Sequence, residues 1–176
     1  MKTGFVVWIT GLPASGKSTV ARILVRIVRE KHNLSIVHLE SDNLRKIFTP
    51  RPTYSSIERE WFYSVLSYLA RLLSESGVHV LIDATGNRRV YRDEARSVTA
   101  RFLEVYVRCP LAVCTSRDPK GIYRRAREGA ASSVPGLQEP YEEPLNPDVV
   151  VESDQTTPEK AAELILEKIM NLDWFN

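Results

Sequence analysis

The sequence predicts an α/β fold with a parallel sheet. Apolar runs typical of buried strands alternate along the chain with segments of helical period, which is the pattern of such layered folds. The runs expected as strands are Phe5–Ile9, Ser35–Leu39, Val78–Asp83, Phe102–Val107 and Asp148–Val151. We therefore expect a five-stranded parallel sheet with helices on both faces and a lid region.

A phosphate-binding motif joins the first expected strand to the first helix. Its pattern G-x-x-x-x-G-K-[ST] is matched by Gly11, Leu12, Pro13, Ala14, Ser15, Gly16, Lys17, Ser18 and Thr19. The glycines let backbone N–H groups turn toward phosphate oxygens, Lys17 reaches the β- and γ-phosphates, and the Ser18 hydroxyl can bind Mg²⁺. In this strand–loop–helix setting the motif predicts a P-loop NTPase fold that binds nucleotide phosphates and Mg²⁺, rather than an ordinary glycine-containing turn, but by itself it does not distinguish a kinase from a GTPase or a motor ATPase.

The first two long helices follow from their apolar spacing. The helix after the loop has apolar residues at Val20, Ile23, Leu24, Ile27 and Val28, and Asn33 suits its end. After a proline-marked loop at residues 50–52, a longer helix has an apolar face between Phe62 and Leu73, and Gly77 ends it.

Two further helices are expected from charge and capping signals. The arginine-rich stretch 88–96 reads as a helix in which Arg88, Arg92 and Arg96 form a solvated face. Thr157 is the expected cap of the last helix, with Pro158 at its first position.

The second half of the chain contains an irregular region. Residues Cys114–Gly121 are expected as a loop between two short helices. The stretch Gly129–Pro147 is rich in proline and glycine and is too long for a simple connection, which indicates a lid or substrate-covering loop. We expect one kinase domain over residues 1–176, with a lid segment at about residues 117–147.

Composition restricts the possible classes of protein. The 176 residues are 43% hydrophobic and 26% charged, with a net charge of +2, so nothing indicates nucleic acid or a membrane as a partner. Cys109 and Cys114 are too few for a disulfide framework and are expected as buried free thiols. No signal peptide or membrane-spanning run is seen, so we expect a soluble cytoplasmic protein.

Two aspartates lie at the carboxyl ends of expected strands, on the side of a parallel sheet where ligands bind. Asp42 can orient or deprotonate an acceptor hydroxyl, although it can also cap the helix at Asn43 and Leu44. Asp83 can bind a magnesium-bound water, and a structural cap is its alternative role. A guanine-reading Asn-Lys-x-Asp is absent, and the lid segment favours a kinase that closes over its substrates.

At this level of detail the chain resembles the adenylylsulfate kinase family. The resemblance is strongest at Cys109–Cys114, Arg117–Tyr123, Pro140–Pro144 and Asn146–Pro147, and Asp42–Arg45 also match the family pattern. It extends from about Gly11 to Val151. It implies transfer of phosphate from ATP to the 3′-hydroxyl of adenosine 5′-phosphosulfate (APS), and a homodimer.

The resemblance also implies roles for individual residues. Asp42 and Lys17 would be catalytic, and Arg117 and Lys120 would contact ATP in the lid segment. Acceptor binding would involve Asp42, Arg45, Tyr54, Arg59, Arg89, Lys120 and Val134, while Ser18 and Asp83 would serve the metal.

The chain departs from the family pattern at several of these positions. Phe62 stands where the family has an asparagine, and Gly86 where it has a serine described as a phosphoserine. Tyr54 and Val134 replace the two phenylalanines that enclose the substrate adenine. The alternatives are therefore a P-loop kinase acting on another hydroxyl, of a small metabolite or a polynucleotide 5′ end, and a nucleotide-binding regulator without transfer activity.

Overall fold

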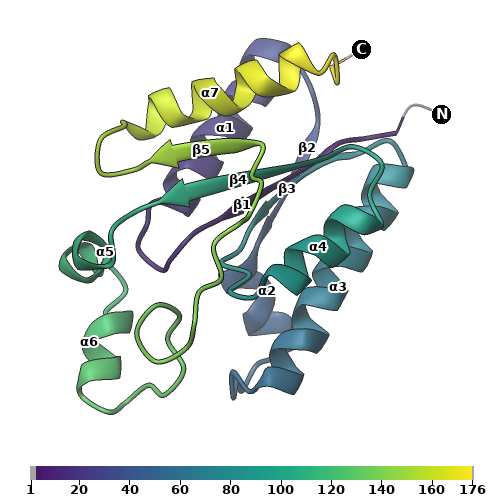
Figure 1. The fold of residues 1–176 in the computed structure, drawn as a ribbon. Coiled ribbons are helices and arrows are strands. Elements are labelled where there is room, and N and C mark those ends of the chain that lie inside the picture. Colours follow the sequence, from purple (N-terminus) through teal and green to yellow (C-terminus); the bar gives the residue numbers. More distant parts are fainter. Residues whose placement is uncertain (1–2, 176) are drawn as a thin grey trace.

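A computed structural model describes residues 3–175 of the chain. Its sheet contains five parallel strands in the order β2-β3-β1-β4-β5 (Figure 1). Their bounds are β1 Val6–Thr10, β2 Ile36–Glu40, β3 His79–Asp83, β4 Phe102–Arg108 and β5 Val149–Glu152. The predicted five-stranded parallel sheet is thus confirmed, with strand ends that differ by no more than one residue from those expected.

Helices cover both faces of the sheet, as Figure 1 shows. One face is covered by α1 (Lys17–His32) and α7 (Pro158–Asn171), and the other by α2 (Ser41–Phe48), α3 (Ser56–Glu75) and α4 (Arg89–Ser97). Two short helices, α5 (Leu111–Arg117) and α6 (Ile122–Arg127), follow β4.

The central strand β1 divides its side chains between two hydrophobic cores. Val7 and Ile9 pack in the core beneath α1 and α7, whereas Val6 and Trp8 pack in the core beneath α3. Because both faces of the sheet are covered, every residue of β1 is buried, which explains its continuous apolar sequence. The strand is therefore a rigid support for the loop that follows it.

The helix-end signals in the sequence are confirmed. Asn33 adopts the left-handed conformation at the end of α1, and its N–H donates to Val28 O. The side chain of Thr157 accepts a hydrogen bond from the Lys160 N–H at 3.3 Å, and Pro158 is the first residue of α7.

The lid segment has one feature that differs from expectation. Residues Cys114–Arg117 belong to α5, so the expected loop is shorter and spans Asp118–Gly121. Beyond α6 the chain is irregular as far as β5, apart from an isolated bridge between Pro135 and Glu139.

A third hydrophobic cluster packs the lid segment against the P-loop. Cys109, Cys114, Tyr123 and Val134 form it with Ala126, and Leu12 of the P-loop contacts it. Both cysteines are free and buried, as expected, and burial raises the pKa of the Cys114 thiol to about 12, so the thiol stays protonated.

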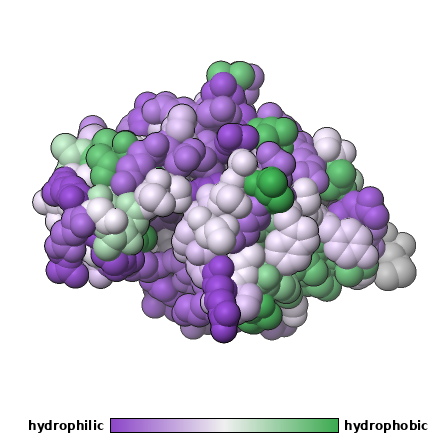
Figure 2. Space-filling view, turned by 90° about the horizontal axis from the view of Figure 1, so that it is seen from below, coloured by the Kyte–Doolittle hydropathy of each residue, from purple (hydrophilic) through white to green (hydrophobic). Residues whose placement is uncertain are grey.

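On the face of the molecule seen in Figure 2, the residues that the structure describes form no large continuous apolar area. Viewed from below, the surface is mostly hydrophilic, with small separate groups of hydrophobic residues (Figure 2). None of the helices within residues 3–175 combines the length and apolar content that crossing a membrane requires.

The cap of α7 leads to a prediction about stability. Replacing Thr157 with alanine removes the acceptor for the Lys160 N–H, so Thr157→Ala should lower the free energy of unfolding by about 1 kcal/mol. Urea denaturation measures the change. Thr156→Ala is the matched control, because Thr156 precedes the cap; an equal loss in both variants would contradict a capping role.

Candidate active site

The P-loop has the backbone conformation that phosphate binding needs. A Cβ atom on Gly11 would lie 2.5 Å from the carbonyl oxygen of Val107, so only glycine fits where the loop leaves β1. Gly16 has a φ of 99° and precedes α1, and the N–H groups of Thr19 and Val20 both donate to its carbonyl oxygen at 3.1 Å. The loop therefore ends at a helix N-terminus, where the helix dipole favours an anion.

Lys17 lies over this loop rather than in the solvent. Its side chain is largely buried, and its Nζ donates to the carbonyl oxygen of Leu12 at 3.0 Å. Burial lowers the pKa of Lys17, whereas the carboxylates of Asp83 and Asp42 act in the opposite direction. The predicted phosphate-binding lysine and both predicted carboxylates thus belong to one electrostatic site.

Two buried oxygens beside the P-loop lack partners among residues 3–175. They are Ser15 Oγ and Asp83 Oδ2, and Asp83 is only 2% exposed. Asp83 ends β3 and is in register with Ile9 of β1, two residues before Gly11. No helix begins at Asp83, since α4 starts only at Arg89, so a helix cap does not explain this carboxylate.

The unpartnered Oδ2 of Asp83 fits a magnesium ion. Magnesium prefers oxygen ligands and retains several waters, so an unpartnered carboxylate can bind it through water. Ser18 lies in the first turn of α1, directly after Lys17, and is partly exposed. The donor set of Ser18 and Asp83 therefore suits a P-loop metal.

Asp42 lies in the first turn of α2 and forms an ion pair with Lys120 of the lid segment. Because α2 already begins at Ser41, the alternative that Asp42 caps the helix is wrong. Burial disfavours the charge of Lys120, but the hydrogen bond and charge of Asp42 outweigh it and raise the pKa of Lys120. The ion pair joins the first turn of α2, just after β2, to the lid segment.

A groove of about 370 Å³ has a lining that includes Tyr54, Arg59, Asn87 and Ser133. Arg59 Nη1 donates to Asn87 Oδ1 at 3.2 Å, and Arg59 Nη2 donates to Ser133 O at 2.6 Å. The groove thus connects α3, the loop after β3 and the lid segment.

Asn87 is a site residue that the sequence analysis missed. It is 1% exposed, and its Nδ2 donates to Pro140 O at 3.2 Å. Its position in the sequence could have indicated a role in the site, because it follows the end of β3 by four residues, on the ligand-binding side of a parallel sheet.

Tyr54 adopts a backbone conformation that is rare for an aromatic residue. Its φ is 55°, and Glu58 stabilises the turn by accepting the N–H groups of Thr53 at 2.6 Å and Tyr54 at 3.2 Å. Burial opposes the charge of Glu58, but these hydrogen bonds outweigh it and lower the Glu58 pKa. The Tyr54 side chain is 41% exposed, so its ring is accessible in the groove.

Arg45 lies beneath this turn. Its guanidinium group is 3.9 Å from the Phe62 ring centroid and 5.1 Å from that of Tyr54, and Arg45 Nη1 is 3.3 Å from Glu58 Oε1. Arg45 is buried and supports Tyr54 in this structure. Phe62, which departs from the family pattern, provides the surface on which Arg45 stacks.

The remaining predicted residues lie in different surroundings. Val134 is 5% exposed in the cluster beneath the lid segment, so it does not face Tyr54 across the groove in this structure. Arg89 donates to Glu143 O at 3.2 Å. Arg117 donates to Ser153 O at 3.0 Å, beyond the end of β5.

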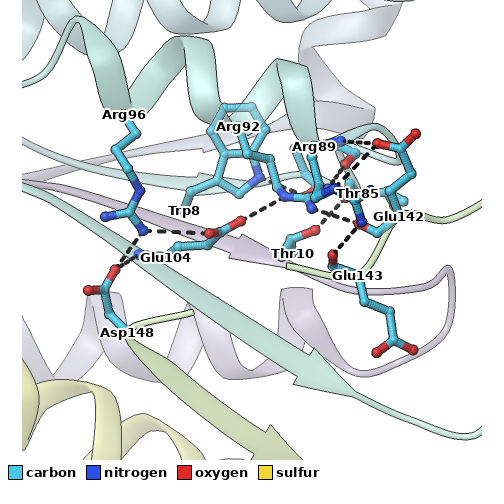
Figure 3. A network of polar contacts seen from close by, with 12 residues as sticks. Trp8, Thr10, Thr85, Arg89, Arg92, Arg96, Glu104, Glu142, Glu143 and Asp148 are labelled. Carbon is cyan, nitrogen blue, oxygen red and sulfur yellow. Dashed lines mark hydrogen bonds and ion pairs between the residues drawn. The ribbon is translucent and has the colours of Figure 1, made fainter. Parts of the chain in front are cut away.

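The prediction that Arg92 lies on a solvated face of α4 is wrong. Arg88 is exposed and pairs with Glu60, and Arg96 is partly exposed, but Arg92 is 1% exposed and forms an ion pair with Glu104 at 2.7 Å (Figure 3). A charge that is paired and hydrogen-bonded can be buried, and the sequence did not reveal a partner on β4.

Comparisons with known proteins agree with this geometry. A profile of the adenylylsulphate kinase family matches residues 3–152. A probable adenylyl-sulfate kinase of Pyrococcus abyssi is 37% identical over 171 residues, which cover 97% of this chain and 98% of that protein. One from Halalkalibacterium halodurans is 40% identical over 162 residues, covering 91% of this chain and 80% of that protein.

A solved structure is similar throughout its length. The APS kinase of Mycobacterium tuberculosis, in complex with AMPPNP and APS, has a TM-score of 0.90 and 34% identity, and the match covers 97% of this chain and 99% of that one. Similarity over nearly the full length of both chains means that they share one fold.

The position of Lys17 predicts its effect on nucleotide binding. Lys17→Met should lower the affinity for a non-hydrolysable ATP analogue by about 10- to 100-fold, because one charge-assisted hydrogen bond to phosphate is lost. The fold should remain intact, since a buried charge is removed. Titration calorimetry and circular dichroism measure both effects. Lys31→Met, at the exposed end of α1, is the control; equal affinity in both variants would contradict the P-loop assignment.

Proposed function

The chain belongs to the adenylylsulfate kinase family, and we infer that it transfers the γ-phosphoryl group of ATP to the 3′-hydroxyl of APS. The products are ADP and 3′-phosphoadenosine 5′-phosphosulfate, which is the activated form of sulfate. The observation that carries this inference is that the family match spans both the P-loop and the lid segment. Sulfate assimilation, a cytoplasmic location and a homodimer are proposed on the same basis, with APS as a small-molecule partner.

On the donor side, the P-loop residues Gly11–Thr19 bind the phosphates of ATP. Lys17 stabilises the negative charge that develops on the transferred group, which is the largest contribution that such a site makes. We assign Arg117 and Lys120 to ATP contacts at the edge of the lid segment. Their positions, after β4 and beside Asp42, support this assignment.

Ser18 and Asp83 would bind the Mg²⁺ ion of the site, Asp83 through a water molecule. The unpartnered buried Oδ2 of Asp83 supports this proposal. The ion would neutralise charge on the β- and γ-phosphate oxygens.

On the acceptor side, Asp42 accepts the proton of the 3′-hydroxyl while that oxygen attacks the γ-phosphorus and ADP leaves. The ion pair with Lys120 holds the Asp42 carboxylate beside the lid segment. Gly86 carries no hydroxyl, so the phosphoryl group passes directly from ATP to the acceptor and no phosphoserine forms there.

The acceptor itself is assigned to the groove beside α3. Tyr54 stacks on the adenine, and Arg59 and Arg89 bind the phosphosulfate group through forked hydrogen bonds. The exposed ring of Tyr54 in the groove supports this. Arg45 acts through Tyr54, and Val134 would contact the acceptor only after the lid segment rearranges.

A coupled assay of ADP release tests the proposed reaction. The purified chain with ATP and Mg²⁺ should release ADP only when APS is added, and adenosine 5′-monophosphate, which lacks the sulfate, should not replace APS. ADP release that requires a different alcohol or a polynucleotide 5′ end, and not APS, would overturn the proposed function.

The role of Asp42 gives a kinetic prediction. Asp42→Asn should lower kcat by about 10²- to 10⁴-fold, because the proton acceptor is lost, while the KM for ATP changes by less than about twofold. Asp93→Asn, an exposed aspartate on α4, is the control. If Asp83→Asn instead gives the Asp42 pattern, Asp83 is the carboxylate that serves the acceptor.

Tyr54 gives a prediction about acceptor affinity. Stacking of a base on an aromatic ring contributes about 1–3 kcal/mol, so Tyr54→Ala should weaken APS binding by about tenfold or more. Tyr54→Phe keeps the ring and should bind APS normally. Tyr68→Ala, an exposed tyrosine elsewhere on α3, should change nothing. Fluorescence titration with APS decides this, and unchanged affinity in Tyr54→Ala would place the base elsewhere.

A further inference from the structure

The buried guanidinium group of Arg92 contacts three separate parts of the chain (Figure 3). Its Nε donates to Glu104 Oε1 on β4 at 2.7 Å. Its Nη2 donates to the carbonyl oxygen of Glu142, in the lid segment, at 2.7 Å, and its Nη1 donates to the carbonyl oxygen of Gly86. One side chain therefore joins the sheet, the loop after β3 and the lid segment.

The ion pair alone does not account for this arrangement. Glu104 also pairs with Arg96 at 3.5 Å, and Arg96 pairs with Asp148 at 2.8 Å, so two arginines face two carboxylates. A lysine at position 92 could neutralise Glu104 equally well. The three donors of a lysine ammonium all lie on one nitrogen, whereas the guanidinium group of Arg92 uses three separate nitrogens to reach Glu104 and the two backbone carbonyls, and both of those carbonyls belong to the acceptor side.

The two carbonyls are part of one junction between the loop after β3 and the lid segment. Gly86 precedes Asn87, whose Oδ1 accepts a hydrogen bond from Arg59 of the groove. The carbonyl oxygen of Asn87 accepts the Glu142 N–H at 2.8 Å. Arg92 thus binds the backbone carbonyl oxygen of Glu142, and Asn87 binds the backbone N–H of the same residue. Asn87 in turn holds the Arg59 side chain through its Oδ1.

The absence of a side chain at position 86 is part of the same fit. A Cβ atom on Gly86 would lie 3.1 Å from Arg92 Cγ and 3.0 Å from Trp8 Cζ2, and the φ of Gly86 is 49°. The stem of Arg92 occupies the space into which a residue at position 86 would project. Gly86 therefore permits the approach of Arg92 to the Gly86 carbonyl oxygen.

We propose that Arg92 is a positioning residue for the acceptor: it joins the lid segment at Glu142 to the Gly86–Asn87 loop and so presents Arg59 to the groove. Arg92 touches neither substrate. The expected effect on the KM for APS rests on the proposed function, whereas the expected effect on the attachment of the lid segment does not. The proposal predicts that loss of the two hydrogen bonds from Arg92 to the carbonyl oxygens of Gly86 and Glu142 releases the lid segment and weakens acceptor binding, while ATP binding is unaffected.

The test compares Arg92→Lys with Arg96→Lys. Both variants keep a positive charge beside Glu104, but only Arg92 also donates to Glu142 and Gly86. A Glu-specific protease probes the lid segment at Glu139 and Glu142, and steady-state kinetics give the KM for APS and for ATP. In Arg92→Lys, we expect cleavage and the KM for APS to rise about tenfold or more, with the KM for ATP within about twofold of wild type.

Arg96→Lys should match the wild type in all three measurements. Equal protease sensitivity in the two variants, or a rise in both KM values, would overturn the proposal and leave Arg92 as an ion-pair residue only. If the wild type does not use APS, the proposed function fails, and the cleavage rates still decide whether Arg92 fixes the lid segment. Should Arg92→Lys not fold, Gly86→Ala displaces the Arg92 stem without removing the charge; unchanged cleavage there would overturn the proposal.

Discussion

The parallel pairing of β1 with both β3 and β4 is the constraint on which the site depends. In this register Ile9 lies opposite Asp83 and Thr10 opposite Tyr106, so the P-loop begins beside the Asp83 carboxylate and against the end of β4. A shift of one residue would turn every side chain of β1 to the other face and exchange Trp8 with Val7 between the two cores. Burial on both faces thus fixes the strands, and the strands fix the relative positions of the phosphate loop and the carboxylates.

The lid segment is attached to this frame by two different kinds of interaction. Near the P-loop the attachment is apolar, because Tyr123 and Val134 pack with Leu12, although the Tyr123 hydroxyl also donates to Pro13 O at 3.0 Å. Near the acceptor groove the attachment is polar and passes through Arg59, Asn87 and Arg92. When the polar attachment opens, its donors and acceptors can hydrogen-bond to water instead, whereas opening the apolar attachment exposes apolar surface that water does not compensate. This asymmetry suits a segment that must admit a charged acceptor yet stay in contact with the nucleotide.

The neighbouring side chains explain two of the departures from the family pattern, Phe62 and Gly86. Phe62 receives the Arg45 guanidinium group on its ring, and Gly86 leaves space for the Arg92 stem. An amide is still present in the groove, but it comes from Asn87, on a different element from Phe62. Each departure alone casts doubt on the acceptor when it is seen in the sequence. In the structure Phe62 and Gly86 are each matched by a neighbouring arginine side chain, and polar residues line the groove.

The sequence by itself determined the features that depend on neighbours along the chain. The P-loop, the Asn33 and Thr157 helix ends and the order of strands and helices all follow from patterns a few residues long, because backbone conformation and amphipathic period are local properties. It did not reveal that α2 begins before Asp42, that Arg92 is buried, or that Asn87 binds Arg59. The last two depend on contacts between residues far apart in the chain, such as Glu142 with Arg92 and Asn87 with Arg59. Whether a charge is solvated or buried is decided by such partners, and only the packing of the sheet, α3 and the lid segment brought them together.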